Sequence, residues 1–581
     1  MGEKIGIKER ILNNRILKHK EMSSVMTIAG VLLFAFIIIY TCQKTLVTKE
    51  EVPVITTNKA EEYFYKGEND KAIKEYENLQ AEEEWPMYSI KIAEVISVSG
   101  EIDKSNNILT ESVVKRNEVI DKNGMESYED KDIEFGNCVA LTFLMNGTYD
   151  KALEYGDFFM NEHKGNKELE RTMFTIYMAN NKLDEARNIL DKYSVDEESS
   201  YDLALYANMN MLVNKWDKGF ELLKKSWYKN KDEIKVYDVI AQISAYNRND
   251  AIMRITELSQ KNPDEVCYKA WLTKCYSMLE ATTDEANTLL NEIKDEDLGQ
   301  TVFQTVIAKI YQHSDKKSES EKILLDICKN KDQSYIGYHA AAWYYLDMGE
   351  YDKALGYCKK SILLNKDYLD NYGFLIPEIM GKLKNGKVVE PYFRTAVIKE
   401  PFNYKVMIEI ANYYWTTEEN TEKAYSYFKL ASLLNPLDGE TYYNMALIKL
   451  KEGNEVKAIE LLNKSISTDE TATKYHRTLG NVFLNAGYND DAIKQIRAAY
   501  AVDKKDILTL NNAGCYYIVV TGDLKRGMIN FKAAYDGLTN ATDQDVRKAI
   551  EDNYSKVKIL NDAYNDYNGE ELQVPEFTLL Y

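Results

Sequence analysis

A small or compact residue, most often alanine, returns every 32 to 35 positions along most of this 581-residue chain. Its only irregular step is the 47 residues from Ser105 to Ala152. The fourteen positions are Ala72, Ser105, Ala152, Ala186, Gly219, Ala251, Ala286, Ser320, Ala354, Val389, Ala424, Ala458, Ala492 and Gly527. A repeat of this length is typical of solenoids, in which helical units stack on their neighbours. We therefore expect an extended binding surface rather than an enclosed catalytic pocket.

Ten of the fourteen repeats have a second small residue twelve or thirteen positions upstream, for example Ala446 before Ala458 and Gly480 before Ala492. The apolar residues around both positions recur at spacings of three and four, which predicts two amphipathic helices per repeat. Small side chains allow two helix backbones to approach closely. The two small positions therefore predict where the helices of each pair meet.

The turn between the two helices carries a recognisable pattern, as in Tyr149-Asp150-Lys151-Ala152-Leu153 and Tyr351-Asp352-Lys353-Ala354-Leu355. With prolines at the ends of some repeats, at Pro263, Pro401 and Pro436, the chain resembles the tetratricopeptide repeat family. The resemblance implies an all-α, right-handed superhelical solenoid of about 14 repeats over residues 53–541. It also implies a protein or peptide partner.

The segment Met22 to Gln43 has 22 residues and no charge, and it follows a segment rich in Lys and Arg. At about 1.5 Å per residue, a helix of this length spans a hydrocarbon core of roughly 30 Å. The sequence thus predicts a basic cytoplasmic segment (1–21), a transmembrane signal-anchor helix (22–43) and a linker (44–52). Because basic flanks stay in the cytoplasm, we expect a single-pass protein of the cell membrane with its solenoid outside the cytoplasm.

Three alternatives to an uncleaved anchor remain. A cleaved signal peptide would have small residues before the cut, and Ile39-Tyr40-Thr41-Cys42 has none. Lipid modification of Cys42 is left open, although Tyr40 and Thr41 are poor substitutes for the usual small residues. A buried core helix is disfavoured, because no other segment of the chain is comparably apolar.

The C-terminal region, residues 542–581, is expected to close the solenoid. Apolar residues at helical spacing between Asp543 and Tyr567 predict a capping helix. For Glu570 to Tyr581 we favour a frayed tail over a segment that packs on the solenoid. We also expect a local break in the superhelix near Pro377, since an interior proline removes a helix hydrogen bond. Pro391 is instead read as a position where a helix begins.

Signatures of enzymes are absent from the sequence. It contains no phosphate-binding glycine loop, no dinucleotide fingerprint and no H-E-x-x-H pair, so we expect neither catalysis nor a cofactor or metal. The seven cysteines form no C-x-x-C motif and are interpreted as buried free thiols. His339, beside Trp343, is read as structural rather than as a surface contact. The net charge of −20 argues against nucleic acid as a partner, and no small-molecule substrate is expected.

The resemblance also indicates where a peptide would bind. In some tetratricopeptide proteins the first helix of each repeat lines the concave face, and an asparagine two positions before the small residue holds a peptide backbone. The matching residues are Asn444 and Asn512, while Thr478 interrupts the series. The other residues predicted on this face are Tyr443, Lys474, Arg477, Asn481 and Asn511.

The sequence therefore favours a non-enzymatic, membrane-anchored scaffold or adaptor at the cell envelope. One alternative is a holdase-like chaperone or assembly factor for exported proteins. Another is the repeat arm of an enzyme, which would need a separate catalytic subunit.

Overall fold

The computed structural model describes residues 52–246, 248–294, 299–314, 316–329, 334–566 and 573–581. These residues contain helices and no β-strand. The chain divides into two units, Met1–Pro53 and Val54–Tyr581, and the second holds every helix described below. The predicted span Met22–Gln43 lies outside the described residues. Among the helices that are described, none is long and apolar enough to cross a bilayer.

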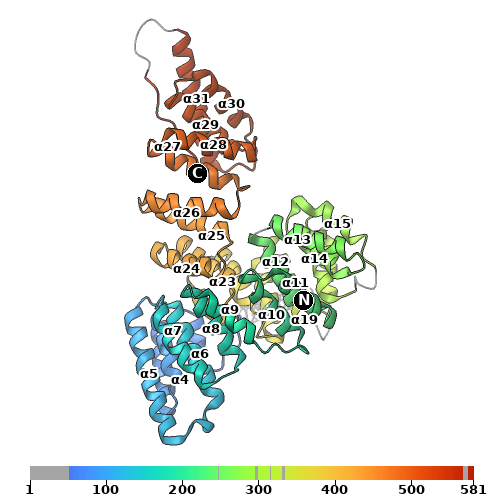
Figure 1. Ribbon diagram of the computed structural model, residues 1–581, viewed down its shortest axis with the longest axis vertical. Coiled ribbons are helices and arrows are strands. Elements are labelled where there is room, and N and C mark those ends of the chain that lie inside the picture. Colours follow the sequence, from blue (N-terminus) through green and yellow to red (C-terminus); the bar gives the residue numbers. More distant parts are fainter. Residues whose placement is uncertain (1–51, 247, 295–298, 315, 330–333, 567–572) are drawn as a thin grey trace, which may run out of the picture. The chain divides into compact units, whose positions relative to one another are not determined.

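Fourteen helix pairs follow one another in the described part of the chain. The first seven are α2 (Lys59–Tyr65) and α3 (Asn69–Glu82), α4 (Met87–Val98) and α5 (Ile102–Asn123), α6 (Glu129–Met145) and α7 (Tyr149–Glu162), α8 (Lys167–Ala179) and α9 (Leu183–Lys192), α10 (Ser200–Leu212) and α11 (Trp216–Lys229), α12 (Ile234–Tyr246) and α13 (Arg248–Lys261), and α14 (Val266–Ser277) and α15 (Thr283–Leu290). The other seven are α17 (Thr301–Gln312) and α18 (Lys317–Ile327), α19 (Ser334–Asp347) and α20 (Tyr351–Leu364), α21 (Ile376–Lys382) and α22 (Glu390–Lys399), α23 (Tyr404–Thr416) and α24 (Thr421–Leu434), α25 (Gly439–Lys451) and α26 (Glu455–Thr468), α27 (Thr473–Asn485) and α28 (Asn489–Val502), and α29 (Ile507–Val519) and α30 (Leu524–Asp536). Figure 1 shows these pairs, with α31 (Gln544–Asn565) after the last of them. Thirteen of the fourteen small positions lie within the second helix of a pair, and Val389 immediately precedes its helix.

The fourteen small positions are all buried, as expected for the contact between paired helices. Where the residue is serine, its hydroxyl crosses the contact: Ser105 Oγ donates to the Ala93 carbonyl at 2.8 Å. Where the small position is glycine, a side chain would not fit, because a Cβ on Gly219 would lie 3.3 Å from the Ala207 carbonyl oxygen. Close packing at this position thus holds the two helices of each repeat together.

The long step between Ser105 and Ala152 comes from one lengthened helix. Helix α5 runs for 22 residues to Asn123, and a 3₁₀ turn at Met125–Ser127 leads into the next repeat. The insertion therefore extends one repeat without interrupting the stack.

The tenth repeat is distorted at its first helix. Residues Asn371–Leu375 form a π-helical turn that continues directly into α21, where Pro377 lies in the first turn. The helix does not end at Pro377, because the widened turn accommodates the missing proline N–H. The irregularity predicted in the superhelix near Pro377 is found here as this π turn and the short helix α21. Pro391 lies at the start of α22, as expected.

The tenth and eleventh repeats fold back onto the inner helices of the first six. The Tyr65 hydroxyl pairs with Thr395 Oγ1 at 2.6 Å, and Arg394 of α22 donates to Ser97 Oγ of α4 at 2.8 Å. Helix α24 packs on α8. The inner face of the first repeats is thus covered by the chain itself.

A buried ion pair marks the end of this covered surface. Lys235 Nζ of α12 lies 2.5 Å from a carboxylate oxygen of Glu400, and both side chains are less than 10% exposed. Nearby, the Gln242 amide donates to Asn403 at 2.8 Å. These contacts join residues that are more than 160 positions apart in the sequence.

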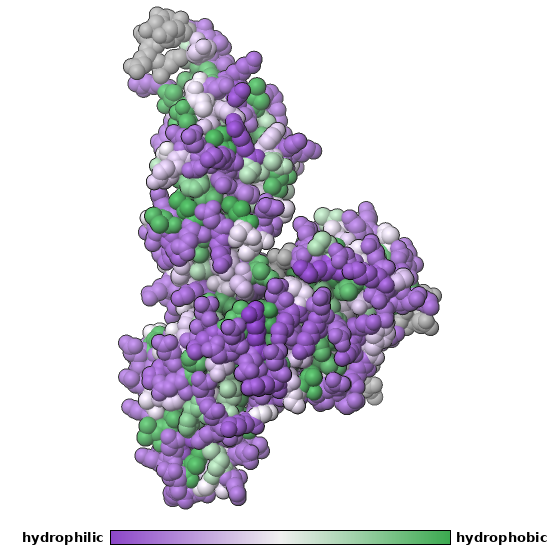
Figure 2. Space-filling view, in the orientation of Figure 1, coloured by the Kyte–Doolittle hydropathy of each residue, from purple (hydrophilic) through white to green (hydrophobic). Residues whose placement is uncertain are grey.

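The surface shown in Figure 2 is largely hydrophilic, with apolar side chains scattered over it. The described cysteines are free thiols, and all but Cys328 are buried.

Replacement of Ala458 by leucine tests the helix contact. Ala458 is fully buried, so three extra carbon atoms have no space, and we expect a loss of about 1–3 kcal/mol in the free energy of unfolding. Val456 on the same helix is 82% exposed, and Val456→Leu is the matched control. Urea denaturation measures both variants. Equal stability of Ala458→Leu and the wild type would contradict the assigned register.

Candidate peptide-binding groove

The inner helices of the last repeats carry a row of buried asparagines. Asn481 on α27, Asn511 and Asn512 on α29, and Asn553 on α31 are fully buried. The Asn553 amide nitrogen donates to Asn511 Oδ1 at 2.9 Å, which links α31 to α29. We call the surface formed by these four residues the asparagine groove.

The chain's own C-terminal tail, residues 573–581, lies in the asparagine groove. The tail has no regular secondary structure, and its end lies beside α27 (Figure 1). The expectation of a frayed tail is therefore wrong. Its hydrogen-bond partners are buried side chains on helices, which local sequence patterns do not reveal.

Two asparagines hold the tail backbone through both ends of their amide groups. Asn553 accepts from the Thr578 N–H at 2.9 Å and donates to the Thr578 carbonyl at 2.7 Å. Asn512 makes the same pair of bonds to Leu580, at 2.9 and 2.6 Å. A primary amide offers one acceptor and two donors, which suits a peptide group. Alternate residues of the extended tail are thus bound through the main chain.

Further contacts secure the same segment. Asn511 donates to the Thr578 carbonyl at 2.9 Å, and Asn481 donates to the Leu580 carbonyl at 2.6 Å. Lys556 donates to the Glu576 carbonyl at 2.9 Å. Burial raises the pKa of the Cys515 thiol to about 12, so this groove residue remains neutral near pH 7.

The tail side chains enter apolar pockets on both sides of the backbone. The Phe577 ring stacks on Phe531 with centroids 5.0 Å apart, and Leu579 joins the same apolar cluster. Leu580 packs with a second cluster that includes Ile550. The main chain is therefore held irrespective of sequence, while these pockets favour apolar side chains.

The other predicted groove residues are placed differently. Lys474 pairs with Glu440 at 2.6 Å, and Arg477 pairs with Asp506 at 2.6 Å. The Tyr443 hydroxyl lies 3.2 Å from Thr478 Oγ1. Asn444 on α25 is half-buried, and its side chain has no hydrogen-bond partner among the described residues. The tail thus contacts Asn481, Asn511 and Asn512. The other four residues form no hydrogen bond with the tail residues that the structure describes, and Lys474, Arg477 and Tyr443 contact neighbouring side chains of the solenoid instead.

Asn553 was missed by the sequence analysis. It follows Asn512 by 41 residues instead of 34, so it falls outside the repeat register. The difference of seven residues is about two helical turns, which returns the side chain to the same helix face. A search for asparagines on the inner face of the capping helix would have found it.

A second concavity lies on the inner face of the middle repeats. It has a volume of about 890 Å³ and is lined by residues of α12, α14, α17 and α19. Burial raises the pKa of Asp238 to about 7 and lowers that of Lys274. His339 lines this cavity, with Nδ1 2.9 Å from Asn371 Oδ1 and Nε2 2.9 Å from Asp370. His339 therefore has structural partners and also contributes to a concave surface.

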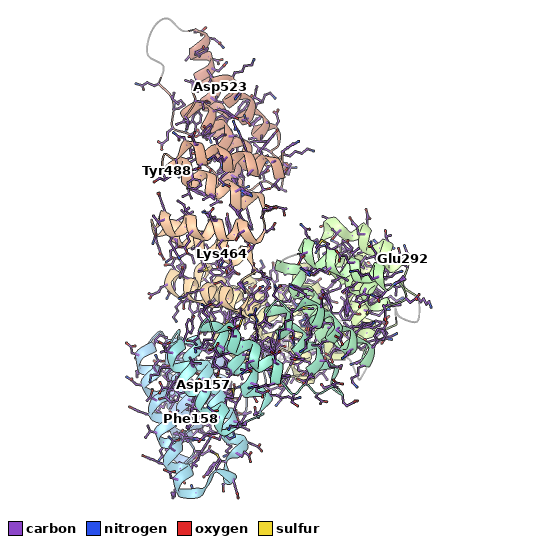
Figure 3. All side chains as sticks on the ribbon, in the orientation of Figure 1. Asp157, Phe158, Glu292, Lys464, Tyr488 and Asp523 are labelled. Atoms are coloured by element: carbon purple, nitrogen blue, oxygen red, sulfur yellow. The ribbon has the colours of Figure 1, made fainter. Side chains whose placement is uncertain are left out.

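One group of described residues has the composition of a metal site: Asp132, Glu162 and His163. The Arg116 guanidinium contacts both carboxylates, with its Nε 2.7 Å from Asp132 Oδ1. It also lies 5.3 Å from the centre of the Phe158 ring, which is labelled on α7 in Figure 3. Arginine thus supplies the positive charge that these carboxylates need, and we assign the group a structural role.

Substitution of Asn553 by alanine should loosen the tail. The change leaves the Thr578 N–H and carbonyl without this partner, at a cost of about 1–3 kcal/mol. We expect carboxypeptidase to release Tyr581 roughly tenfold faster, because the rate follows the fraction of open tail. Asn463→Ala, at an exposed site on α26, is the control. Equal rates for both variants and the wild type would show that Asn553 does not hold the tail.

Comparison with known proteins agrees with the helix pairs. The family model described as tetratricopeptide repeat matches residues 336–368 and 439–471. No curated protein sequence matches the chain. The first stretch covers most of α19 and all of α20, and the second covers α25 and α26.

Several solved structures resemble the chain at low identity. One is a chain of the Naa15/Naa10 complex bound to HypK-THB, which is 13% identical in sequence. The match covers 88% of the present chain and 97% of the matched chain, with a TM-score of 0.38. PilF of Pseudomonas aeruginosa is 15% identical, and the match covers 39% of the present chain and 99% of PilF, with a TM-score of 0.33. YrrB, described as a TPR protein with an unusual peptide-binding site, is 17% identical. The match covers 34% of the present chain and 97% of YrrB, with a TM-score of 0.27. The tetratricopeptide repeat model thus matches two of the fourteen helix pairs of the described residues, and the other pairs have the same helix-turn-helix architecture.

Proposed function

We propose that the protein is a non-enzymatic scaffold whose asparagine groove binds an extended segment of a partner protein. The observation that carries this proposal is the paired hydrogen bonding of Asn512 and Asn553 to alternate residues of the tail. An extended backbone presents its N–H and C=O to the same side at every second residue, which matches this spacing. The tail is thus an example of the kind of ligand that the groove accepts.

The tail also competes with any partner for the groove. Because it is tethered to the same chain, its effective concentration is high, on the order of millimolar for a short flexible connection. A partner must therefore bind more tightly than the tail or act when the tail is released. This competition favours a dedicated partner over weak, transient contacts.

The alternative function is a holdase-like chaperone. Main-chain hydrogen bonds do not depend on sequence, which suits broad binding of unfolded chains. The pockets around Phe577 and Leu579 are specific for apolar side chains at defined positions, and this observation favours the scaffold. Recovery of one partner at fixed stoichiometry supports the scaffold, and recovery of many unfolded proteins supports the holdase.

The proposal includes an anchor at Met22–Gln43, with the solenoid outside the cytoplasm. Its support is the sequence: 22 uncharged residues after a basic segment. A scaffold held at the membrane would present its groove to partners at the cell envelope.

A peptide added in trans tests the groove directly. The chain that ends at residue 572 should bind a synthetic peptide of residues 574–581 at a one-to-one ratio, and the intact chain should bind it at least tenfold more weakly. Asn512→Ala combined with Asn553→Ala should reduce affinity about a hundredfold, since each lost amide costs about 1–3 kcal/mol. Calorimetric titration gives these values, with Asn463→Ala as the control. Failure of the shortened chain to bind the peptide would overturn the proposal.

Protease accessibility tests the proposed topology. Protease added to intact spheroplasts should digest the solenoid, because the basic flank before Met22 keeps the N-terminus in the cytoplasm. Immunoblotting detects the loss of the full-length chain, and a cytoplasmic protein serves as the protected control. Survival of the chain while an external control protein is cleaved would place the solenoid in the cytoplasm.

A further inference from the structure

The cavity of the middle repeats is formed by two parts of the chain. Helices α12, α14, α17 and α19 supply most of its wall, and residues of the segments 365–374 and 400–405 complete it. The contacts Lys235–Glu400 and Gln242–Asn403 hold the returning segment in place. The volume of about 890 Å³ falls within the range of roughly 300–1,000 Å³ that is typical of small-molecule sites.

Most of the cavity wall is apolar or aromatic. The Tyr368 ring meets Tyr335 edge to face, with the ring centres 5.7 Å apart, and Trp343 lines the same space. Ala241 and Met278 are among the aliphatic residues of the wall. A ligand of this cavity gains most from an apolar body, because it removes that surface from water.

The charged side chains of the wall mostly have partners. The ion pairs that involve them are Lys235 with Glu400, Lys309 with Asp347, His339 with Asp370, Lys399 with Asp367, and Lys405 with Asp438. Two charged groups differ. Among the described residues, the Lys274 ammonium has no hydrogen bond or ion pair, and the Asp238 carboxylate accepts only a long bond of 3.4 Å, from the Tyr368 hydroxyl.

Both of these groups can be reached from the cavity. Asp238 on α12 and Lys274 on α14 are half-buried and line it, and the two helices are neighbours. The two side chains do not form an ion pair with each other. Burial disfavours the charged form of each, which raises the pKa of Asp238 and lowers that of Lys274. A counter-charge beside each group would offset this cost.

We propose that the cavity binds a small zwitterion, namely an α-amino acid with a large apolar or aromatic side chain. Its ammonium group faces the Asp238 carboxylate and its carboxylate faces the Lys274 ammonium. Its side chain lies against the apolar part of the wall. Opposite charges attract strongly in a site that is largely removed from water, so a ligand with one charge leaves the other wall group uncompensated.

This site is independent of the asparagine groove and of the proposed scaffold function. The sequence analysis expected no small molecule, because Asp238 and Lys274 are 36 residues apart and belong to no local motif. Only the stacking of α12 on α14 brings the two charges to one cavity.

Three ligands of similar size test the two charges separately. L-Phenylalanine carries both charges, phenylpropionate only the carboxylate, and phenylethylamine only the ammonium. Each is titrated calorimetrically into the intact chain at about pH 8, above the pKa of Asp238. We expect L-phenylalanine to bind at a one-to-one ratio and each analogue to bind at least tenfold more weakly.

Two substitutions locate the ligand. Lys274→Met should weaken binding of L-phenylalanine at least tenfold without weakening phenylethylamine, and Asp238→Asn should do the same without weakening phenylpropionate. Lys322→Met and Asp284→Asn, at exposed sites on α18 and α15, are the matched controls. Circular dichroism confirms that each variant is folded, and the comparison of ligands in the wild type needs no variant.

Absence of saturable binding by L-phenylalanine, L-tryptophan and L-leucine would overturn the inference. Equal affinity for L-phenylalanine and either analogue would also contradict it, because one of the two charges would then have no role. Binding that survives both Lys274→Met and Asp238→Asn would place the ligand elsewhere. Each of these results leaves the asparagine groove untouched.

Discussion

The structure depends on the close contact between the two helices of each repeat. At this contact alanine, serine or glycine is buried in nearly every repeat, and a serine hydroxyl or a glycine Cα lies directly against the facing backbone. Because the contact fixes each pair, successive pairs stack in a constant register. The stacked inner helices bring Asn481, Asn512 and Asn553 onto one surface, although they are 31 and 41 residues apart in the sequence. The binding geometry is thus a consequence of helix packing.

The chain fills its own inner surface at two places. Repeats ten and eleven cover the inner face of the first six repeats, through contacts such as Arg394 with Ser97 and the buried pair Lys235–Glu400. Removing one partner of a buried ion pair is strongly destabilising, so this contact is a permanent part of the fold. The tail is held in a different way, by hydrogen bonds to a short extended segment whose end residue is about half exposed. We therefore regard the first contact as structural and the second as exchangeable.

Much of the repeat architecture could be predicted from sequence, since the period of the small residues has a direct structural cause. All fourteen predicted positions are buried between paired helices. The position of the tail could not be predicted, because nine residues without periodicity give no local signal and their partners are distant in sequence. The contact of Tyr65 with Thr395 could not be predicted either, because these two residues are also distant in sequence. The role of Asn553 was not predicted, because the capping helix is offset from the repeat. The π turn before Pro377 was not predicted either, because a proline alone does not distinguish a break from a widened turn.

The central claim is that the C-terminal tail lies in the asparagine groove as a bound peptide. Hydrogen–deuterium exchange of the intact chain tests it most directly, because the amides of Thr578 and Leu580 donate to buried asparagines. The account predicts that these two amides exchange at least tenfold more slowly than in a free peptide of residues 574–581, and that Asn512→Ala with Asn553→Ala removes the difference. Exchange at the free-peptide rate in the intact chain would contradict the account.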